Sequence, residues 1–212
     1  MELDIDPDEF EMLEPQLKNG VPMLQFADRL ANGAGYCKRL ATPSDGEGSP
    51  LVIALVRSLL APMKDPLMRS IVAESHHKHC FSACYDCIQR YGNRMFHGLL
   101  DWRLGISFLR LLLDASWAVG LDGDFTSYEI CDWFYHAELM RDNLCTLKAE
   151  QYEKVDIKLH GVKLPAIKRN HDYIALTHPF WDEAYVLEHL PQQTKIFTTF
   201  EALRRPLRIV SL

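Results

Sequence analysis

The sequence lacks several features that would place it in a common functional class. It has no run of apolar residues approaching the ~20 needed for a helix to cross a bilayer, so an integral membrane protein is excluded. It contains no Gly-Lys dipeptide and no Asp-Glu-x-His or Asp-Glu-x-Asp box, so the lysine and the Mg²⁺-binding acid of an ATP-hydrolysing motor are both missing. No signal peptide precedes the acidic opening residues, which predicts a reducing, cytoplasmic location.

An excess of basic charge is also missing. The net charge is −6, and seven of the 29 acidic residues lie within residues 1–15, which hold no basic residue. The rest of the chain carries 22 acidic and 23 basic residues. A domain that binds phosphates nonspecifically is usually clearly basic. Any contact with nucleic acid is therefore expected to be local or shared with a partner.

What the sequence does contain is a short segment rich in metal ligands. Three cysteines with the spacing C-x3-C-x2-C follow three closely spaced histidines: Cys80, Cys84, Cys87, His76, His77 and His79. Thiolate and imidazole at such short spacing are what a tetrahedral Zn²⁺ selects. We predict a Zn²⁺ site made by the three cysteines and His76, because the spacing H-x3-C leaves a loop that can wrap the ion.

The fourth ligand and the use of the cysteines have alternatives. His77, His79 or the distant Cys37 can also complete a tetrahedron. A disulfide with a spare thiol is the plainest alternative to a metal. Cys131 and Cys145 lie in a helical apolar pattern, where a free cysteine usually acts as a small buried hydrophobe, so we leave both out of the site. The same spacing also resembles the cluster motif of radical S-adenosylmethionine enzymes, but Asp86 replaces their usual aromatic residue and no strand is expected soon after the cysteines.

Periodicity predicts an α+β protein, a helical zinc-binding body followed by a small C-terminal β-sheet. Residues 1–121 form the helical zinc-binding domain, with an acidic N-terminal strand at Met1–Ile5. Residues 122–212 add a helix and a small mixed sheet. The expected helices are 51–60, 66–74, 98–121, 128–150 and 201–205, and the expected strands are 155–159, 162–167, 173–176, 195–199 and 207–210. Asp101 and Arg103 are costly to bury unpaired and are expected to meet partners around the cysteine loop.

Other patches allow two interpretations each. Asn32-Gly33-Ala34-Gly35-Tyr36 matches no phosphate-binding consensus, so a packing turn is favoured over a phosphate cradle. Asp156-x-Lys158 suggests a metal-dependent nuclease, but no Pro-Asp partner precedes it, and an exposed edge strand explains the pattern. Contact with nucleic acid or a partner protein is predicted for basic residues near the C-terminus: Lys168, Arg169, Arg204 and Arg205.

Taken together, several spaced elements resemble the MrfA-type zinc-binding (MZB) domain, which lies at the C-terminal end of large DEAD/DEAH-box helicases and of helicase-like anti-phage proteins such as the DrmB component of DISARM. These elements are residues 32–36, the cysteine segment with Tyr85 and Asp86, Tyr91-x-Asn93-x3-His97, and the stretch Leu100-Asp101-Trp102-Arg103-Leu104-Gly105. The opening ELDIDPDEF and the closing RRP also resemble the flanks of that region, so the resemblance spans nearly the whole chain. One departure is Lys78, which occupies the place of a fourth cysteine.

The resemblance implies a function linked to DNA without catalysis by this chain. A motor domain or subunit is the implied partner, with DNA contacted through the complex. The chain is then either a C-terminal piece of a helicase or a separately encoded subunit, acting in phage defence or DNA repair. A metal-dependent nuclease and a purely structural protein–protein adaptor are the alternatives.

Overall fold

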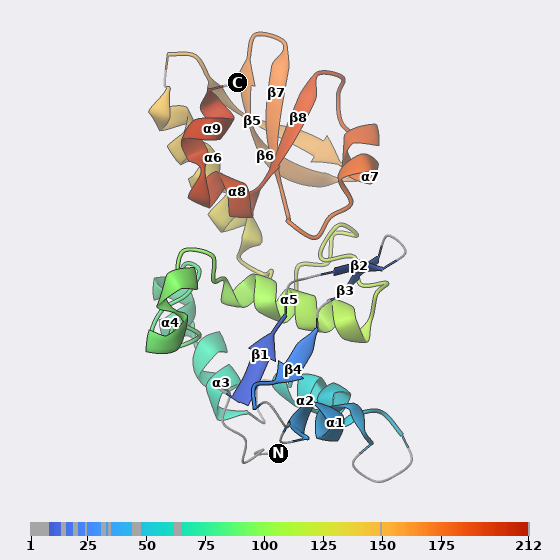
Figure 1. Cartoon of the computed structure of the whole chain (residues 1–212). Coiled ribbons are helices and arrows are strands. Elements are labelled where there is room, and N and C mark those ends of the chain that lie inside the picture. The colour runs from blue at the N-terminus through green and yellow to red at the C-terminus, as the bar shows by residue number, and fades with distance from the viewer. Residues whose placement is uncertain are drawn as a thin grey trace. The chain divides into compact units, whose positions relative to one another are not determined.

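The computed structural model describes most of the 212-residue chain and divides it into two compact units, residues 1–69 and residues 70–212 (Figure 1). The described residues are 9–13, 16–18, 21–23, 25–30, 33, 35–43, 48–61, 65–148 and 150–211. The domain boundary predicted between residues 121 and 122 falls within the second unit. The strand predicted at Met1–Ile5 lies outside the described residues.

Among its described residues, the first unit has two small two-stranded sheets and two helices. Its elements are β1 (Phe10–Met12), β2 (Gln16–Lys18), β3 (Val21–Met23), β4 (Phe26–Asp28), α1 (Tyr36–Ala41) and α2 (Leu51–Leu59). Strand β1 pairs antiparallel with β4, and β2 pairs antiparallel with β3. Helix α3 (Pro66–Val72) spans the boundary between the units.

The described residues of the glycine-rich segment, Gly33 and Gly35, belong to a turn before α1. Gly33 and Gly35 have φ angles of 63° and 75°, which a residue with a side chain rarely adopts. The carboxylate of Asp28 accepts hydrogen bonds from the backbone N–H groups of Gly35 and Cys37, both at 2.8 Å. A negative charge thus already occupies the position that a phosphate cradle would offer to its ligand. These contacts agree with the favoured interpretation.

The second unit combines helices with one four-stranded sheet, as the predicted α+β class requires. Its elements are α4 (Glu74–His79), the 3₁₀ helix η2 (Tyr91–Phe96), α5 (Trp102–Leu113), α6 (Trp133–Leu147), β5 (Glu153–Leu159), β6 (Val162–Arg169), β7 (Asp172–Thr177), α7 (Glu183–Glu188), β8 (Thr194–Thr198), α8 (Thr199–Arg204) and α9 (Pro206–Val210). The strand order is β5-β6-β7-β8. Strands β5, β6 and β7 form an antiparallel meander, whereas β8 returns through α7 to lie parallel to β7.

Apolar residues cover both faces of this sheet, because successive side chains of a strand point to opposite sides. On one face, Leu159 and Leu164 pack in a buried cluster with Val186 of α7. On the other face, Ile167 and Leu176 pack in a cluster that α6, α8 and α9 complete. Figure 1 shows these three helices together on one side of the sheet and α7 on the opposite side. Helices therefore contribute to both buried clusters, and α6 takes part in each of them.

Three predicted elements differ from the structure. The predicted helix 98–121 is shorter, because the carboxylate of Asp114 accepts the N–H of Ser116 and forms a turn where α5 ends. Helix α6 begins at Trp133 instead of residue 128, after turns that bury Glu129 beside Arg110. The predicted strand 207–210 is the helix α9, which starts at Pro206, and proline suits a first helical turn.

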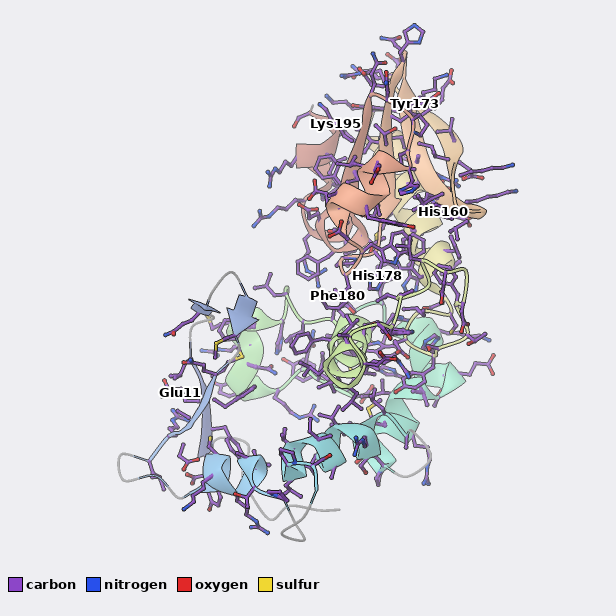
Figure 2. The ribbon with its side chains drawn as sticks, turned by 90° about the vertical axis from the view of Figure 1, so that its right-hand side faces the viewer. Glu11, His160, Tyr173, His178, Phe180 and Lys195 are labelled. Atoms are coloured by element: carbon purple, nitrogen blue, oxygen red, sulfur yellow. The ribbon has the colours of Figure 1, made fainter. Side chains whose placement is uncertain are left out.

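A buried histidine after β7 makes the stability of the second unit dependent on pH. His178 is only 4% exposed, and its Nδ1 accepts the N–H of Phe180 at 3.2 Å (Figure 2). Burial lowers the pKa of His178 to about 3, whereas an unfolded histidine has a pKa of about 6.5. As the pH falls below 6.5, His178 is therefore protonated in the unfolded chain but stays neutral in the folded chain. Stability is fully present above pH 6.5 and is lost as the pH falls toward 3.

We expect this histidine to account for a loss of about 3 kcal/mol in the free energy of unfolding between pH 6.5 and pH 4. His178→Gln keeps an acceptor for Phe180 but cannot be protonated, so this part of the loss disappears. Urea unfolding at a series of pH values, for wild type and variant, measures the difference. Equal losses in the two proteins contradict the assignment.

Candidate metal centre

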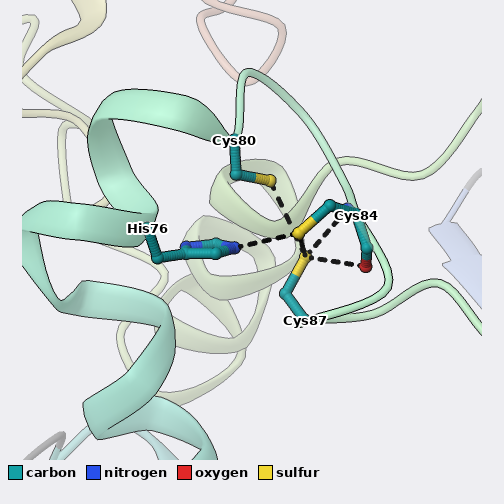
Figure 3. A group of neighbouring side chains, drawn as sticks. All are labelled: His76, Cys80, Cys84 and Cys87. Carbon is teal, nitrogen blue, oxygen red and sulfur yellow. Dashed lines mark hydrogen bonds between the residues drawn. The ribbon is translucent and has the colours of Figure 1, made fainter.

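Four predicted ligands converge at the start of the second unit (Figure 3). His76 lies in α4, Cys80 directly follows that helix, and Cys84 and Cys87 lie in the next turn. We call these four residues the cysteine-histidine group. Their ligand atoms all lie within 4.8 Å of one another, and no other donor belongs to this group in the described part of the chain.

The distances within the cysteine-histidine group fit one tetrahedral ion. The Sγ atom of Cys87 lies 3.8 Å from that of Cys80 and 3.7 Å from that of Cys84. The Sγ atom of Cys84 lies 3.4 Å from Nε2 of His76. Zinc bond lengths imply separations of about 3.8 Å between two thiolates and about 3.6 Å between a thiolate and an imidazole nitrogen. The donor set and its size therefore match a single Zn²⁺.

A hydrogen bond selects the ring nitrogen that His76 offers. Its Nδ1 lies 2.8 Å from the carbonyl oxygen of Ile71, and because a carbonyl only accepts, Nδ1 carries the proton. The lone pair of Nε2 consequently faces the sulfur of Cys84. A zinc-bound histidine usually donates its other N–H to such an acceptor.

The alternative fourth ligands lie elsewhere. The ring of His77 faces the carbonyl of Tyr128 and the carboxylate of Asp132. His79 does not belong to the cysteine-histidine group. Cys37 lies in the first unit, where its backbone N–H is bonded to Asp28. Among the candidates considered from the sequence, His76 is the one that the structure places with the three cysteines.

Local hydrogen bonds shape the loop that carries Cys84 and Cys87. The backbone N–H of Cys84 donates to the sulfur of Cys87 at 3.1 Å, and the carbonyl of Cys84 accepts the N–H groups of Cys87 and Gln89. The side chain of Gln89 donates to the carbonyl of Ala83. These bonds hold Cys84 and Cys87 together in one tight loop.

Asn93 and His97 hold the segment that follows the cysteines. The side chain of Asn93 accepts the N–H of Arg90 at 2.8 Å and donates to the carbonyl of Ile88 at 2.9 Å. Nε2 of His97 lies 3.0 Å from the carbonyl oxygen of Arg90 and from Oδ1 of Asn93. The motif Tyr91-x-Asn93-x3-His97 therefore fixes the backbone behind the loop and supplies no donor to the cysteine-histidine group.

Arg103 ties four segments of the site together. Its guanidinium, in a residue that is 6% exposed, donates to the carbonyls of Cys80 and Phe81, both at 3.1 Å, and to that of His77 at 3.3 Å. Nε and Nη2 also reach the two carboxylate oxygens of Asp132, at 3.1 and 2.6 Å. This confirms the expectation that Arg103 meets partners around the cysteine loop.

The residues beside Arg103 also hold α5 against that loop. Asp101 instead caps its own helix, because its carboxylate accepts the N–H groups of Arg103 and Leu104, so these bonds do not reach the cysteine loop as expected. Trp102 is 2% exposed, and its backbone N–H donates to the carbonyl of Ser82 at 2.9 Å. Burial raises the pKa of the Asp101 carboxyl, which backbone donors and nearby arginines partly offset.

The protein environment alone does not favour the thiolate form of Cys80. Burial raises the pKa of the Cys80 thiol, and the neighbouring Cys87 and Cys84 raise it further. Three negative sulfurs this close repel one another, so the deprotonated group needs a compensating cation. A bound divalent ion would supply that charge.

The other uses of the cysteines do not fit. All six cysteines are described, and all are free; the sulfurs of the group lie well beyond the ~2.05 Å of a disulfide bond. A cubane binds its cysteines on separate iron corners, whereas these sulfurs surround one position. Residues 88–148, all of them described, contain no strand, so the partial barrel expected for a radical enzyme is missing there.

The four basic residues predicted to contact nucleic acid or a partner differ in how far their side chains are already engaged within this protein. Arg204 donates to the carbonyls of Gly98, Leu100 and Phe200, and its guanidinium stacks 3.7 Å from the ring centroid of Phe200. Its donors are thus directed at this protein's own backbone. Lys168 and Arg169 lie over the rings of Tyr173 and Tyr152 at the end of β6, and Arg205 lies between α8 and α9.

Asp156 has a structural partner. It lies on β5 at the edge of the sheet, exposed, and pairs with Arg141 of α6 at 2.9 Å. This arrangement agrees with the edge-strand interpretation of Asp156-x-Lys158.

Sequence reasoning missed a second group of donors. His77, Cys131 and Asp132 place their ligand atoms within 4.8 Å of one another. Cys131 is exposed, contrary to its expected burial, whereas Cys145 is buried as predicted. The adjacent pair Cys131-Asp132, followed four residues later by His136, was the available sequence signal.

Comparisons with protein-family models, with curated proteins and with solved structures found no match to this chain. Among the described residues, no helix has the length and apolar character that membrane crossing requires.

Proposed function

We propose that the cysteine-histidine group binds one Zn²⁺ and that the chain is a non-catalytic accessory module, or separately encoded subunit, of a DNA helicase-like complex in anti-phage defence or DNA repair. The observation that carries the zinc assignment is the closed donor set: three sulfurs and one nitrogen at tetrahedral spacing. Zinc sites with four protein ligands are structural, whereas catalytic sites keep one position open. Bound Zn²⁺ would supply a rigid cross-link between α4 and the loop that precedes η2.

The roles of the residues in the motifs support the proposed relation to MZB domains. Asp28 and the two positive-φ glycines shape the entry to α1. Asn93 and His97 fix the backbone after the last cysteine. Arg103 binds the carbonyls of the cysteine loop. Motif residues that either offer metal donors or brace the chain fit a module whose task is to present a rigid surface to a motor, and the partner would supply the ATPase.

Contact with DNA is tested at Lys168 and Arg169, because Arg204 is engaged with backbone carbonyls. We expect the zinc-loaded chain to bind fluorescent single-stranded or duplex oligonucleotides, measured by anisotropy. Lys168→Ala/Arg169→Ala should weaken binding several-fold and reduce the slope of log K against log salt by about 2, one for each lost phosphate contact.

Lys158→Ala/Lys163→Ala is the matched control, since it removes two exposed lysines from the same sheet. This pair should leave binding nearly unchanged. Equal affinities of all three proteins would remove Lys168 and Arg169 from the DNA contact. No binding at all would favour a protein–protein adaptor.

A further inference from the structure

We propose that His77, Cys131 and Asp132 form a second Zn²⁺ site, separate from the cysteine-histidine group and with one coordination position open. The three donors are an imidazole nitrogen, a thiol and a carboxylate, each an established zinc ligand. Their ligand atoms lie within 4.8 Å of one another, and Nδ1 of His77 lies 3.5 Å from Oδ2 of Asp132. Tetrahedral zinc separates such donors by about 3.3 to 3.6 Å, so His77 and Asp132 already have this spacing, and the sulfur of Cys131 lies within 4.8 Å of both.

The hydrogen bond of His77 selects the ring nitrogen that it could offer to an ion. Its Nε2 lies 3.1 Å from the carbonyl oxygen of Tyr128, and since a carbonyl only accepts, Nε2 carries a proton. Nδ1 is then the ring nitrogen that faces a carboxylate oxygen of Asp132, and it could share an ion with that oxygen. His76 is held in the same way, with one ring nitrogen on a carbonyl and the other facing its metal donors.

Arg103 already binds Asp132, and this contact is compatible with a metal ion. Nε donates to Oδ1 and Nη2 to Oδ2, and each carboxylate oxygen keeps a second lone pair. A ligating carboxylate is itself usually hydrogen-bonded by its surroundings. With the thiolate of Cys131 and the carboxylate of Asp132, the charge of a divalent ion would be neutralised locally, and Arg103 would keep its hydrogen bonds to the carbonyls of Cys80, Phe81 and His77.

The proposed second site would differ from the first in the number of its protein ligands and in how readily its metal ion exchanges. Three protein ligands leave a fourth position for water or for the ring of His136, whose Nε2 lies 3.4 Å from Oδ2 of Asp132. Because Cys131 is exposed, the ion can enter and leave without unfolding of the chain. Its loading would connect α4 with the residues that precede α6, which makes the site a means for zinc concentration to set the rigidity of this region.

The site is tested by metal stoichiometry of the full chain equilibrated with buffered Zn²⁺ and measured by inductively coupled plasma mass spectrometry. Wild type should hold two ions per chain and Cys131→Ser one. Cys37→Ser is the matched control, because Cys37 is also a free thiol but lies in the first unit, and it should hold two. Cys84→Ser should keep the ion of the second site.

Alkylation of Cys131 by iodoacetamide, followed by peptide mass spectrometry, gives a second readout that needs no variant. Zinc should slow this reaction at least about tenfold, because coordination blocks the thiolate. One ion per chain in wild type, lost in Cys84→Ser and without protection of Cys131, overturns this site and leaves the site of the cysteine-histidine group intact. One ion that is lost in Cys131→Ser and kept in Cys84→Ser supports this site and removes the other. Two ions that persist in Cys131→Ser overturn it.

Discussion

Removal of the metal from the cysteine-histidine group, by a chelator or by Cys87→Ser, is expected to unfold residues 70–113 and to leave the sheet β5–β8 folded. Structural zinc contributes about 10–16 kcal/mol at pH 7, which is comparable to the ~5–15 kcal/mol of a whole domain. Few large apolar side chains are buried in this stretch, chiefly Ile71, Trp102 and Ile106. The two buried clusters of the sheet are instead formed by residues from Val119 onward.

Hydrogen exchange followed by mass spectrometry measures this outcome peptide by peptide. Exchange should accelerate throughout residues 70–113 after chelation, whereas peptides from β6 and β7 should keep their protection. Cys145→Ser is the control, since Cys145 is a buried thiol in α6 that lies outside the metal group. It should retain zinc and lose only about 1 kcal/mol. Unchanged exchange in the chelated protein would show that the metal does not hold this segment.

Arg103→Met is expected to destabilise the second unit by about 3–5 kcal/mol, because it removes one partner of a buried ion pair. Asp132 would lose both of its guanidinium donors, and the carbonyls of Cys80 and Phe81 would lose theirs. Urea unfolding measures the loss. Zinc affinity should fall about 10- to 100-fold, as is usual when a group supporting metal ligands is removed, and competition with a chromophoric chelator measures it.

Two further variants separate charge from geometry at this position. Arg103→Lys keeps the charge but not the planar fork, so it should still lose most of the stability. Arg103→Met/Asp132→Asn removes both charges and should recover part of the loss, which a double-mutant cycle quantifies. Arg94→Met is the control, because the contact shown for the Arg94 side chain within the described residues is with the exposed ring of Tyr91. It should change stability by about 0.5 kcal/mol or less. A small effect of Arg103→Met would contradict the role assigned to this residue.

Much of the site was accessible from the sequence because its ligands are close in sequence. The spacing from His76 to Cys87 already defines a loop around one ion, and Arg103 was recognisable as a charge inside an apolar helix. The sheet could be predicted because apolar residues alternate in several segments between residues 153 and 198. These features depend on local patterns, which periodicity and spacing report directly.

The remaining features depend on contacts between distant segments. Residues 207–210 were predicted as a strand because their apolar residues are too few to distinguish the periods of a strand and a helix. In the structure they form a helix, and Ile209 and Val210 pack in the buried cluster on the sheet. The proximity of His77 to Cys131 arises where α4 meets the turn before α6. The sequence spacing of these residues does not predict that they lie close together.

The bonds of Arg204 to Gly98 and Leu100 span 106 and 104 residues of chain. Protein synthesis proceeds from the N-terminus. The cysteine loop and α5 therefore leave the ribosome well before Arg204, which binds the segment between them. The nascent chain could therefore bind a metal ion before Arg204 forms these bonds, because all four residues of the cysteine-histidine group have by then been translated. A nascent chain that ends before Arg204 would contain the whole cysteine-histidine group and still lack the side chain that binds Gly98 and Leu100.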